Sequence, residues 1–205
     1  AHPLLPLSVV TDRMRGTAYL TLAFTGVGMF AIFLFLTFYM EHNLGFTPIQ
    51  AGAGFLPMIA MVMVGAVVSG TVFMPRTGPR PLVPLGALLA AIGLALLAGI
   101  GADTGYAGAV LPGIMVTGLG FGFIFGPVQN AETSRVSTDT AGIASAMVNT
   151  SQQLGGSLGT ALFTAIFTLS TTTLVSDGSA QVEATIASYH LVFWVGAGIF
   201  TTAAI

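Results

Sequence analysis

The stretch that decides the fold is Gly113–Phe163, GIMVTGLGFGFIFGPVQNAETSRVSTDTAGIASAMVNTSQQLGGSLGTALF, in which two apolar, glycine-rich runs flank one short polar segment. The first run extends to Ala131, and the second begins at Ala141. Between them, Glu132–Thr140 holds one arginine and two acidic residues, a dense cluster in a chain that is only 6% charged. An apolar run of about 20 residues can cross a membrane as a helix. The stretch therefore predicts two membrane helices joined by a short loop in water.

The same pattern continues on both sides of this stretch. The chain has 205 residues, of which 54% are hydrophobic, and its mean hydropathy is +0.92, whereas soluble domains carry about 25% charged residues. We therefore expect an all-α membrane protein with six transmembrane helices. The expected helices are 16–40, 51–74, 82–102, 106–131, 141–169 and 189–205. A membrane β-barrel is not predicted, because its strands alternate in polarity over about ten residues.

Two local features bear on the boundaries of the chain and of its helices. Thr47 and Pro48 predict the start of the second helix, with Thr47 as N-cap and Pro48 at the first helical position. The chain starts at Ala1, its first residues lack the order of a signal peptide, and it is still apolar at Ile205. We therefore expect it to be an internal fragment of a longer protein.

The placement of charges predicts an orientation. With six crossings, the links at 75–81 and 132–140 lie on the side of the N-terminal segment, and those at 41–50, 101–106 and 170–188 lie on the other side. The first side holds all the arginines, Arg13, Arg15, Arg76, Arg80 and Arg135. The second side holds Glu41, Asp103, Asp177 and Glu183 and no basic residue other than histidine. Because basic loops stay in the cytoplasm, we expect the arginine-bearing loops there and the chain in a bacterial plasma membrane. We also expect the link 170–188, which is rich in Ser, Thr and Asp, to be the most mobile.

Several classes of protein are disfavoured by what the sequence lacks. There is no cysteine, and the three histidines, His2, His42 and His190, are too scattered for a common metal-ligand spacing. No span offers a paired acid and base or an activated nucleophile. We expect no enzyme, no metal and no cofactor. The expected surroundings are the lipid bilayer, with no nucleic-acid partner.

Small residues recur inside the spans, for example at Gly26, Gly65, Gly93 and Gly155. Such residues let helix backbones approach closely in lipid, so they predict helix contacts. The glycines at 118–122 follow no strand, which argues against a dinucleotide-binding loop.

Four stretches together resemble the major facilitator superfamily, in particular its fourteen-helix drug:proton antiporter branch. These stretches are Arg13–Gly16, Glu41–Pro57, Arg76–Pro81 and Asn149–Gly159, whose NTSQQLGGSLG is similar to a run in the penultimate helix of that branch. The resemblance covers nearly all of the chain. It implies the C-terminal six-helix half of the fold, built of two inverted three-helix repeats.

By this resemblance, the chain is part of a multidrug-resistance efflux transporter that couples proton entry to the export of small drug-like, apolar or cationic compounds by alternating access. Its partners are then the N-terminal half of the same protein, the substrate and protons. No acid lies at the centre of a span, so we expect the coupling carboxylate outside this fragment. A non-transporting membrane scaffold or receptor bundle, held together by the same small residues, is the alternative.

The resemblance also implies that the first and fourth helices line a substrate cavity near the membrane midplane. The candidate cavity residues are Thr21, Thr25, Tyr39, Met58, Met61, Thr117, Phe121, Phe125, Gln129, Asn130, Asn149, Gln152 and Gln153. The methionines would adapt to varied ligands, although a Met or Phe in a membrane helix more often faces lipid or packs against a neighbour than binds a ligand. The amides at 149, 152 and 153 either bond across helices or face a wet cavity.

Charged residues at the arginine-bearing side are candidates for gating. Glu132, Arg135 and Asp139 are expected to pair within their loop, and Arg76 and Arg80 to hold the helix ends shut against neighbouring acids. The alternative for both of the latter arginines is that they only set the topology.

Overall fold

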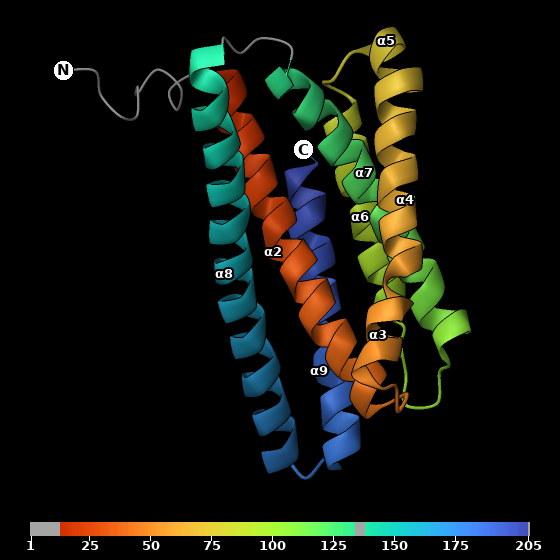
Figure 1. Cartoon of the computed structure of the whole chain (residues 1–205). Coiled ribbons are helices and arrows are strands. Elements are labelled where there is room, and N and C mark those ends of the chain that lie inside the picture. Colours follow the sequence, from red (N-terminus) through yellow and green to blue (C-terminus); the bar gives the residue numbers. More distant parts are fainter. Residues whose placement is uncertain (1–12, 134–137, 205) are drawn as a thin grey trace, which may run out of the picture.

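The computed structural model describes residues 13–133 and 138–204, and within these two ranges the regular structure is helical, with no strand. The helices are α2 (Arg13–His42), α3 (Pro48–Gly54), α4 (Leu56–Val68), η1 (Ser69–Phe73), α5 (Met74–Thr77), α6 (Leu82–Leu97), η2 (Tyr106–Val110), α7 (Leu111–Thr133), α8 (Thr138–Ser176) and α9 (Gln181–Ala203). The two η segments are π-helical. Figure 1 shows the helices as a bundle of long elements. The predicted all-α membrane class is confirmed.

Five helical stretches in the described part are long and apolar enough to cross a membrane. They are Leu20–His42, Pro48–Thr77, Tyr106–Pro127, Ser145–Ser176 and Gln181–Ala203. The remaining apolar helix, α6, has 16 residues, which gives it a length of about 24 Å at 1.5 Å per residue. It is therefore shorter than the expected helix 82–102.

The C-terminal boundary expected for this helix at residue 102 is wrong. After Leu97 the chain turns, and glycines at 99 and 101 weaken any continuation of the helix. In this turn the Gly101 N–H donates a hydrogen bond to the Thr104 Oγ1, at 2.6 Å. Tyr39 of α2 also stabilises this turn, because its hydroxyl donates to the Gly101 carbonyl at 2.7 Å.

The long link expected at 170–188 is also wrong. Helix α8 continues to Ser176 and α9 begins at Gln181, which leaves only residues 177–180 between them. The hydroxyl side chains that suggested a loop bond back onto their own helices, as Thr185 does to the Gln181 carbonyl at 2.7 Å. Such back-bonding satisfies Ser and Thr inside a helix.

The predicted start of the second helix is confirmed. The Thr47 Oγ1 accepts from the Gln50 N–H, and the Gln50 side chain accepts from the Thr47 N–H at 2.9 Å, which together form a capping box. The stretch Pro48–Thr77 that follows is interrupted at Phe55, before Pro57, and by η1. Pro75 lies just beyond η1, and a proline lacks the N–H that a regular helix uses.

The helices place charge at opposite ends of the bundle. The start of α2, the link 78–81 and the ends of α7 and α8 that adjoin residues 134–137 lie at one end, whereas the links 43–47, 98–105 and 177–180 lie at the other (Figure 1). We call the first the arginine end, because it carries Arg76 and Arg80, and the second the acidic end, because it carries Glu41, Asp103, Asp177 and Glu183. This grouping of the links matches the predicted alternation. The side of the membrane that each end faces stays a prediction.

Glycines allow close contact between α4 and α7, between α6 and α7, and between α2 and α8. A Cβ placed on Gly65 of α4 would lie 2.6 Å from the Leu119 carbonyl oxygen of α7. A Cβ on Gly120 of α7 would lie 2.5 Å from the Ala90 nitrogen of α6. Between α2 and α8, a Cβ on Gly26 would lie 2.5 Å from the Gln152 carbonyl oxygen. The small residues thus form helix contacts, as predicted from the sequence.

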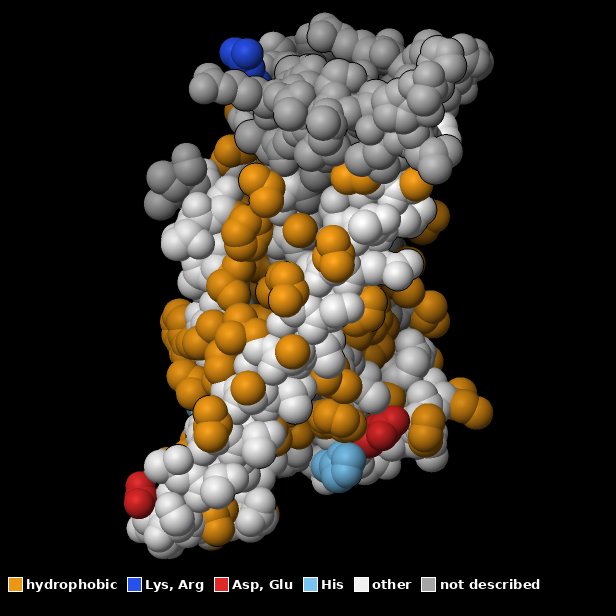
Figure 2. Space-filling model, turned by 90° about the vertical axis from the view of Figure 1, so that its left-hand side faces the viewer, with side chains coloured by type: hydrophobic (Ala, Val, Ile, Leu, Met, Phe, Trp, Pro, Cys, Tyr) orange, Lys and Arg blue, Asp and Glu red, His pale blue; other side chains and the backbone are white. Residues whose placement is uncertain are grey.

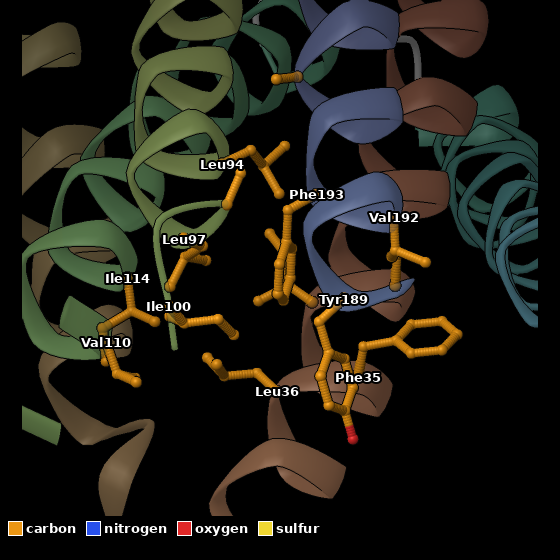
Figure 3. Packing of buried hydrophobic residues seen from close by; sticks show 14 of the residues in the cluster. Phe35, Leu36, Leu94, Leu97, Ile100, Val110, Ile114, Tyr189, Val192 and Phe193 are labelled. Atoms are coloured by element: carbon orange, nitrogen blue, oxygen red, sulfur yellow. The ribbon is translucent and has the colours of Figure 1, made fainter. Parts of the chain in front are cut away.

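A buried apolar cluster joins α2, α6, α7 and α9. Figure 3 shows Phe35 and Leu36 of α2 with Leu94 and Leu97 of α6 and Phe193 of α9, all of them buried. In contrast, only 11% of the most apolar window of Ser145–Ser176 and 22% of that of Pro48–Thr77 is buried. Figure 2, which views the molecule from the side on which α8 lies, shows hydrophobic side chains over the middle and charged ones only toward the two ends. The bundle therefore leaves faces of α4 and α8 uncovered.

Candidate functional site

A groove lies between α4, α7 and α8, and we call it the amide groove because one amide is its only polar lining side chain. Its volume is about 550 Å³. It is lined by Val62, Met63, Ala66, Val67, Phe125, Gly126 and Gln152. Three helices that are distant in sequence thus bring apolar walls to a single hydrogen-bonding group, an arrangement typical of sites for small organic molecules.

The backbone around Gln152 is held by two glycines. Gly26 of α2 lies against the Gln152 carbonyl, and Gly155 of α8 lies against the backbone of Ala23. Both contacts exclude any side chain larger than hydrogen without a movement of the helices. The Gln152 side chain itself is half-buried. Close packing of α2 on α8 therefore positions this amide at the groove.

A second, larger groove runs along α8 and reaches Phe30 of α2, and we call it the hydroxyl groove. Its volume is about 1130 Å³. Its polar residues follow the helical spacing of three and four, and they are Gln153, Ser157, Thr160, Thr164 and Thr168. Ser157 bonds back to the Gln153 carbonyl at 2.8 Å. Gln153 was predicted from the sequence, whereas the four hydroxyl residues were not, although their spacing could have revealed them.

Helix α8 presents two different faces along its length. Its exposed leucines at 154, 158 and 162 lie on one side, and the polar residues of the hydroxyl groove lie on a neighbouring side, where Leu169 also lines the groove. Leu158 is 68% exposed. Helix α8 therefore combines a leucine-rich side with a side rich in hydroxyl groups.

Five of the predicted cavity residues lie between packed helices instead of on a groove. Thr25, Tyr39, Met58, Thr117 and Phe121 are each no more than 1% exposed. The hydroxyls of the two threonines are bonded locally, with Thr117 donating to the Gly113 carbonyl at 2.8 Å and Thr25 to the Thr21 carbonyl at 2.8 Å. A solute could reach these side chains only if the helices separated.

The remaining candidates fall into three groups. Phe125 and Gln152 line the amide groove, and Gln153 lines the hydroxyl groove. Asn149 is exposed on α8, while Thr21 and Met61 are half-buried and line neither of these two grooves. The structure thus brings Gln152 together with Phe125, whereas Gln153 and Asn149 lie elsewhere on α8. The side chains of Gln129, Asn130, Glu132 and Asp139, and all of Arg135, lie outside the described residues.

The arginines proposed as gates have a local role at the arginine end. Both Arg76 and Arg80 are exposed, and the Arg76 Nη1 donates to the Val72 carbonyl at 2.8 Å. This bond gives the Val72 carbonyl a charged donor near the helix end, where a cation also complements the helix dipole. Gly78 then ends α5 with φ of +74°. Within the described residues neither arginine forms an ion pair, so the gating role stays a prediction.

Comparison with known proteins places the chain among membrane transporters. A sequence model described as Major Facilitator Superfamily matches residues 2–160. The puromycin resistance protein pur8 of Streptomyces alboniger is 36% identical over 99% of this chain and 42% of its own length. The cephamycin export protein CmcT of Amycolatopsis lactamdurans is 29% identical over 99% of this chain and 40% of its own length.

A third relative, the tetracenomycin C resistance and export protein of Streptomyces glaucescens, is 34% identical over 78% of this chain and 29% of its own length. The chain thus spans less than half the length of these curated relatives.

Proposed function

The chain belongs to the major facilitator superfamily, and on that premise we propose that it forms the C-terminal half of a transporter that exports small drug-like, apolar or cationic compounds. Relatives that match 99% of the chain are named for puromycin resistance and cephamycin export. The share of their length that it covers, 42% and 40%, fits one half of such a protein.

The observation that carries this proposal is the amide groove. Its walls are apolar except for Gln152, so a bound compound would bury apolar surface and direct one polar group to the amide. Met63, which is 66% exposed at the groove, adds a flexible side chain that fits ligands of different shape. Such a surface favours a class of compounds over a single one.

The uncovered faces of α4 and α8 also support the proposal that the chain is one half of a transporter. These two spans have the lowest buried shares in the described part, 22% and 11%, and both contribute to the amide groove. We propose that the remaining half of the transporter packs against them. The groove would then lie between the two halves, and rocking of the halves would expose it to each side in turn.

Proton coupling belongs to the same proposal. All seven acidic residues of the chain lie near expected helix ends or in links, and none lies at the centre of a span. A proton relay through the membrane requires a titratable group inside it. The coupling carboxylate would therefore lie in the other half, and this half would supply the substrate surface and the moving body. By the positive-inside rule the arginine end faces the cytoplasm.

The experiment that tests this proposal compares two substitutions on α8 of the full-length transporter. Gln152→Leu removes the groove amide, whereas Leu158→Ala alters a residue that is 68% exposed and lines neither groove. Loss of one hydrogen bond should weaken the apparent affinity for a polar drug roughly two- to tenfold. Initial efflux rates at increasing drug concentration should show this change for Gln152→Leu only. Equal affinities in both variants would count against the amide groove as the substrate site.

A further inference from the structure

A third groove, which we call the acidic-end groove, lies between the ends of α2 and α8 and the start of α9. Its volume is about 530 Å³. It shares no lining residue with the amide groove or the hydroxyl groove. Its aromatic wall comes from Phe38, Phe167 and Tyr189, and its polar lining includes His42, Asn43 and Gln181.

The aromatic wall is a connected set of rings from three helices. The Phe167 and Tyr189 ring centroids lie 5.0 Å apart, and Phe38 meets His42 edge-on at 6.0 Å. Phe35 links the two pairs, since its ring lies 5.3 Å from Phe167 and 6.5 Å from Phe38. Ring contacts of this kind fix each aromatic side chain in place. Phe38 is nevertheless 40% exposed, so part of a held ring remains open to a ligand.

Several polar groups of the groove are free to bind a ligand. Within the described structure, the side-chain amides of Asn43 and Gln181 form no hydrogen bond. The His42 ring uses only Nδ1, which contacts the Phe38 carbonyl at 3.1 Å. By contrast, Thr171 already donates to the Ser188 hydroxyl at 2.8 Å. Two amides and one imidazole nitrogen can therefore reach polar atoms of a molecule that lies on the rings.

No acidic residue lines this groove, but the charged residues of the described chain at the same end of the bundle are all acidic. The acidic end carries Glu41, next to His42, and Glu183, in the first turn of α9, together with Asp103 and Asp177. No arginine or lysine of the described residues lies at this end. Aromatic faces attract cations through the ring quadrupole, and nearby carboxylates add to this attraction. An anion would meet repulsion from both.

From this combination we propose that the acidic-end groove binds an aromatic organic cation, whose ring packs on Phe38 and Phe167 and whose positive charge is attracted by the aromatic faces that line the groove and, at longer range, by the carboxylates at this end of the bundle. The site is separate from the amide groove. The proposal does not depend on transport, because it concerns binding at one end of the bundle.

Photolabelling of the full-length protein in phosphatidylcholine nanodiscs tests the proposal, since this lipid carries no net charge. The probes are a benzophenone with a quaternary ammonium group and a benzophenone of the same length with a sulfonate group. Cross-linked peptides are identified by mass spectrometry. We expect the cation to label the peptides that contain Phe38–Asn43 and Gln181–Tyr189, and the anion to label them several-fold less. Equal labelling by both probes, or labelling elsewhere only, would overturn the proposal.

Phe38→Leu tests the aromatic wall of the groove, and Phe30→Leu on the same helix is its matched control. Phe38 and Phe30 are exposed to similar extents, 40% and 48%, but Phe30 lines the hydroxyl groove. Phe38→Leu should weaken labelling by the cation roughly two- to fivefold, as expected for one cation–π contact at an exposed site. Phe30→Leu should leave labelling of the acidic-end groove unchanged. A similar loss in both variants would show non-specific partitioning into the membrane and overturn the site.

A second variant keeps the test decisive if Phe38→Leu fails to fold. Glu183 is exposed in the first turn of α9, so Glu183→Gln should leave the bundle intact. It should reduce the preference for the cationic over the anionic probe. An unchanged preference would contradict the role of charge. Gln152→Leu should leave labelling here unaffected, which separates this site from the amide groove.

Discussion

The contact between α6 and α7 depends on glycine at position 120, and its replacement by alanine tests this packing. The new Cβ would lie 2.5 Å from the Ala90 nitrogen and 2.6 Å from the Gly86 carbonyl oxygen. Ordinary contacts of a Cβ begin at about 3.4 Å, and both neighbours are backbone atoms that cannot rotate away. The helices must therefore separate by roughly 1 Å, and overpacking of this kind costs about 1–3 kcal/mol.

Alanine also favours a helix over glycine by about 1 kcal/mol, which would mask part of this cost. Gly198→Ala in α9 is the matched control, because no atom lies within 4 Å of its new Cβ. The difference between the two variants in the free energy of unfolding cancels the gain in helix propensity and leaves an overpacking cost of about 1–3 kcal/mol. Unfolding of the purified full-length protein in mixed detergent measures both variants. An equal change in the free energy of unfolding would refute the close approach of α6 and α7.

Three further predictions follow from single contacts. Thr47→Ala removes the capping box of α3 and should lower the free energy of unfolding by about 1 kcal/mol, whereas Thr47→Ser should restore most of it in the same detergent assay. Tyr39→Phe removes the hydroxyl that donates to the half-buried Gly101 carbonyl, which still accepts from the Thr104 hydroxyl, and should cost about 0.5–1.5 kcal/mol; an unchanged unfolding curve would contradict this bond. A cysteine at the exposed Asn149 should react with a water-soluble maleimide in the folded full-length protein, while a cysteine at the buried Thr117 should not, and equal labelling would contradict the burial of α7.

Much of the fold could be predicted because lipid allows few solutions. A membrane segment must bond its own backbone, so each long apolar run could only be a helix. The capping box at Thr47 was visible as a local pattern, and the glycines were visible as contact points. Charge alternation also grouped the links at the two ends correctly.

The errors arise where local composition does not determine local structure. Residues 98–102 are small or apolar and looked like helix, but the Gly101 turn is held by Tyr39, which is distant in sequence. Residues 170–188 looked like a loop, but their hydroxyls bond back to helix carbonyls. Tertiary partners and side-chain rotamers decide such cases, and neither can be read from a window of sequence.

The candidate site could be predicted only in part for a related reason. The identity of a residue in an apolar helix does not show which way it faces, because most positions on all sides are apolar. Phe121 and Phe125 lie one turn apart on α7, yet Phe121 is enclosed and Phe125 lines the amide groove. The amides were better guides, since an amide in a membrane needs a polar partner. Gln152 and Gln153 were chosen on this ground, and each lines a groove.

We propose proton-driven export by a transporter of which this chain forms one half. The most direct measurement places the full-length protein in liposomes and follows a fluorescent drug-like cation, such as ethidium, after a pH gradient is imposed. We expect the dye to move against the proton flow, and we expect this movement to be abolished by an uncoupler and slowed by Gln152→Leu. Dye movement that is the same with and without the gradient would contradict proton coupling, and no movement above protein-free liposomes would contradict the export of such compounds.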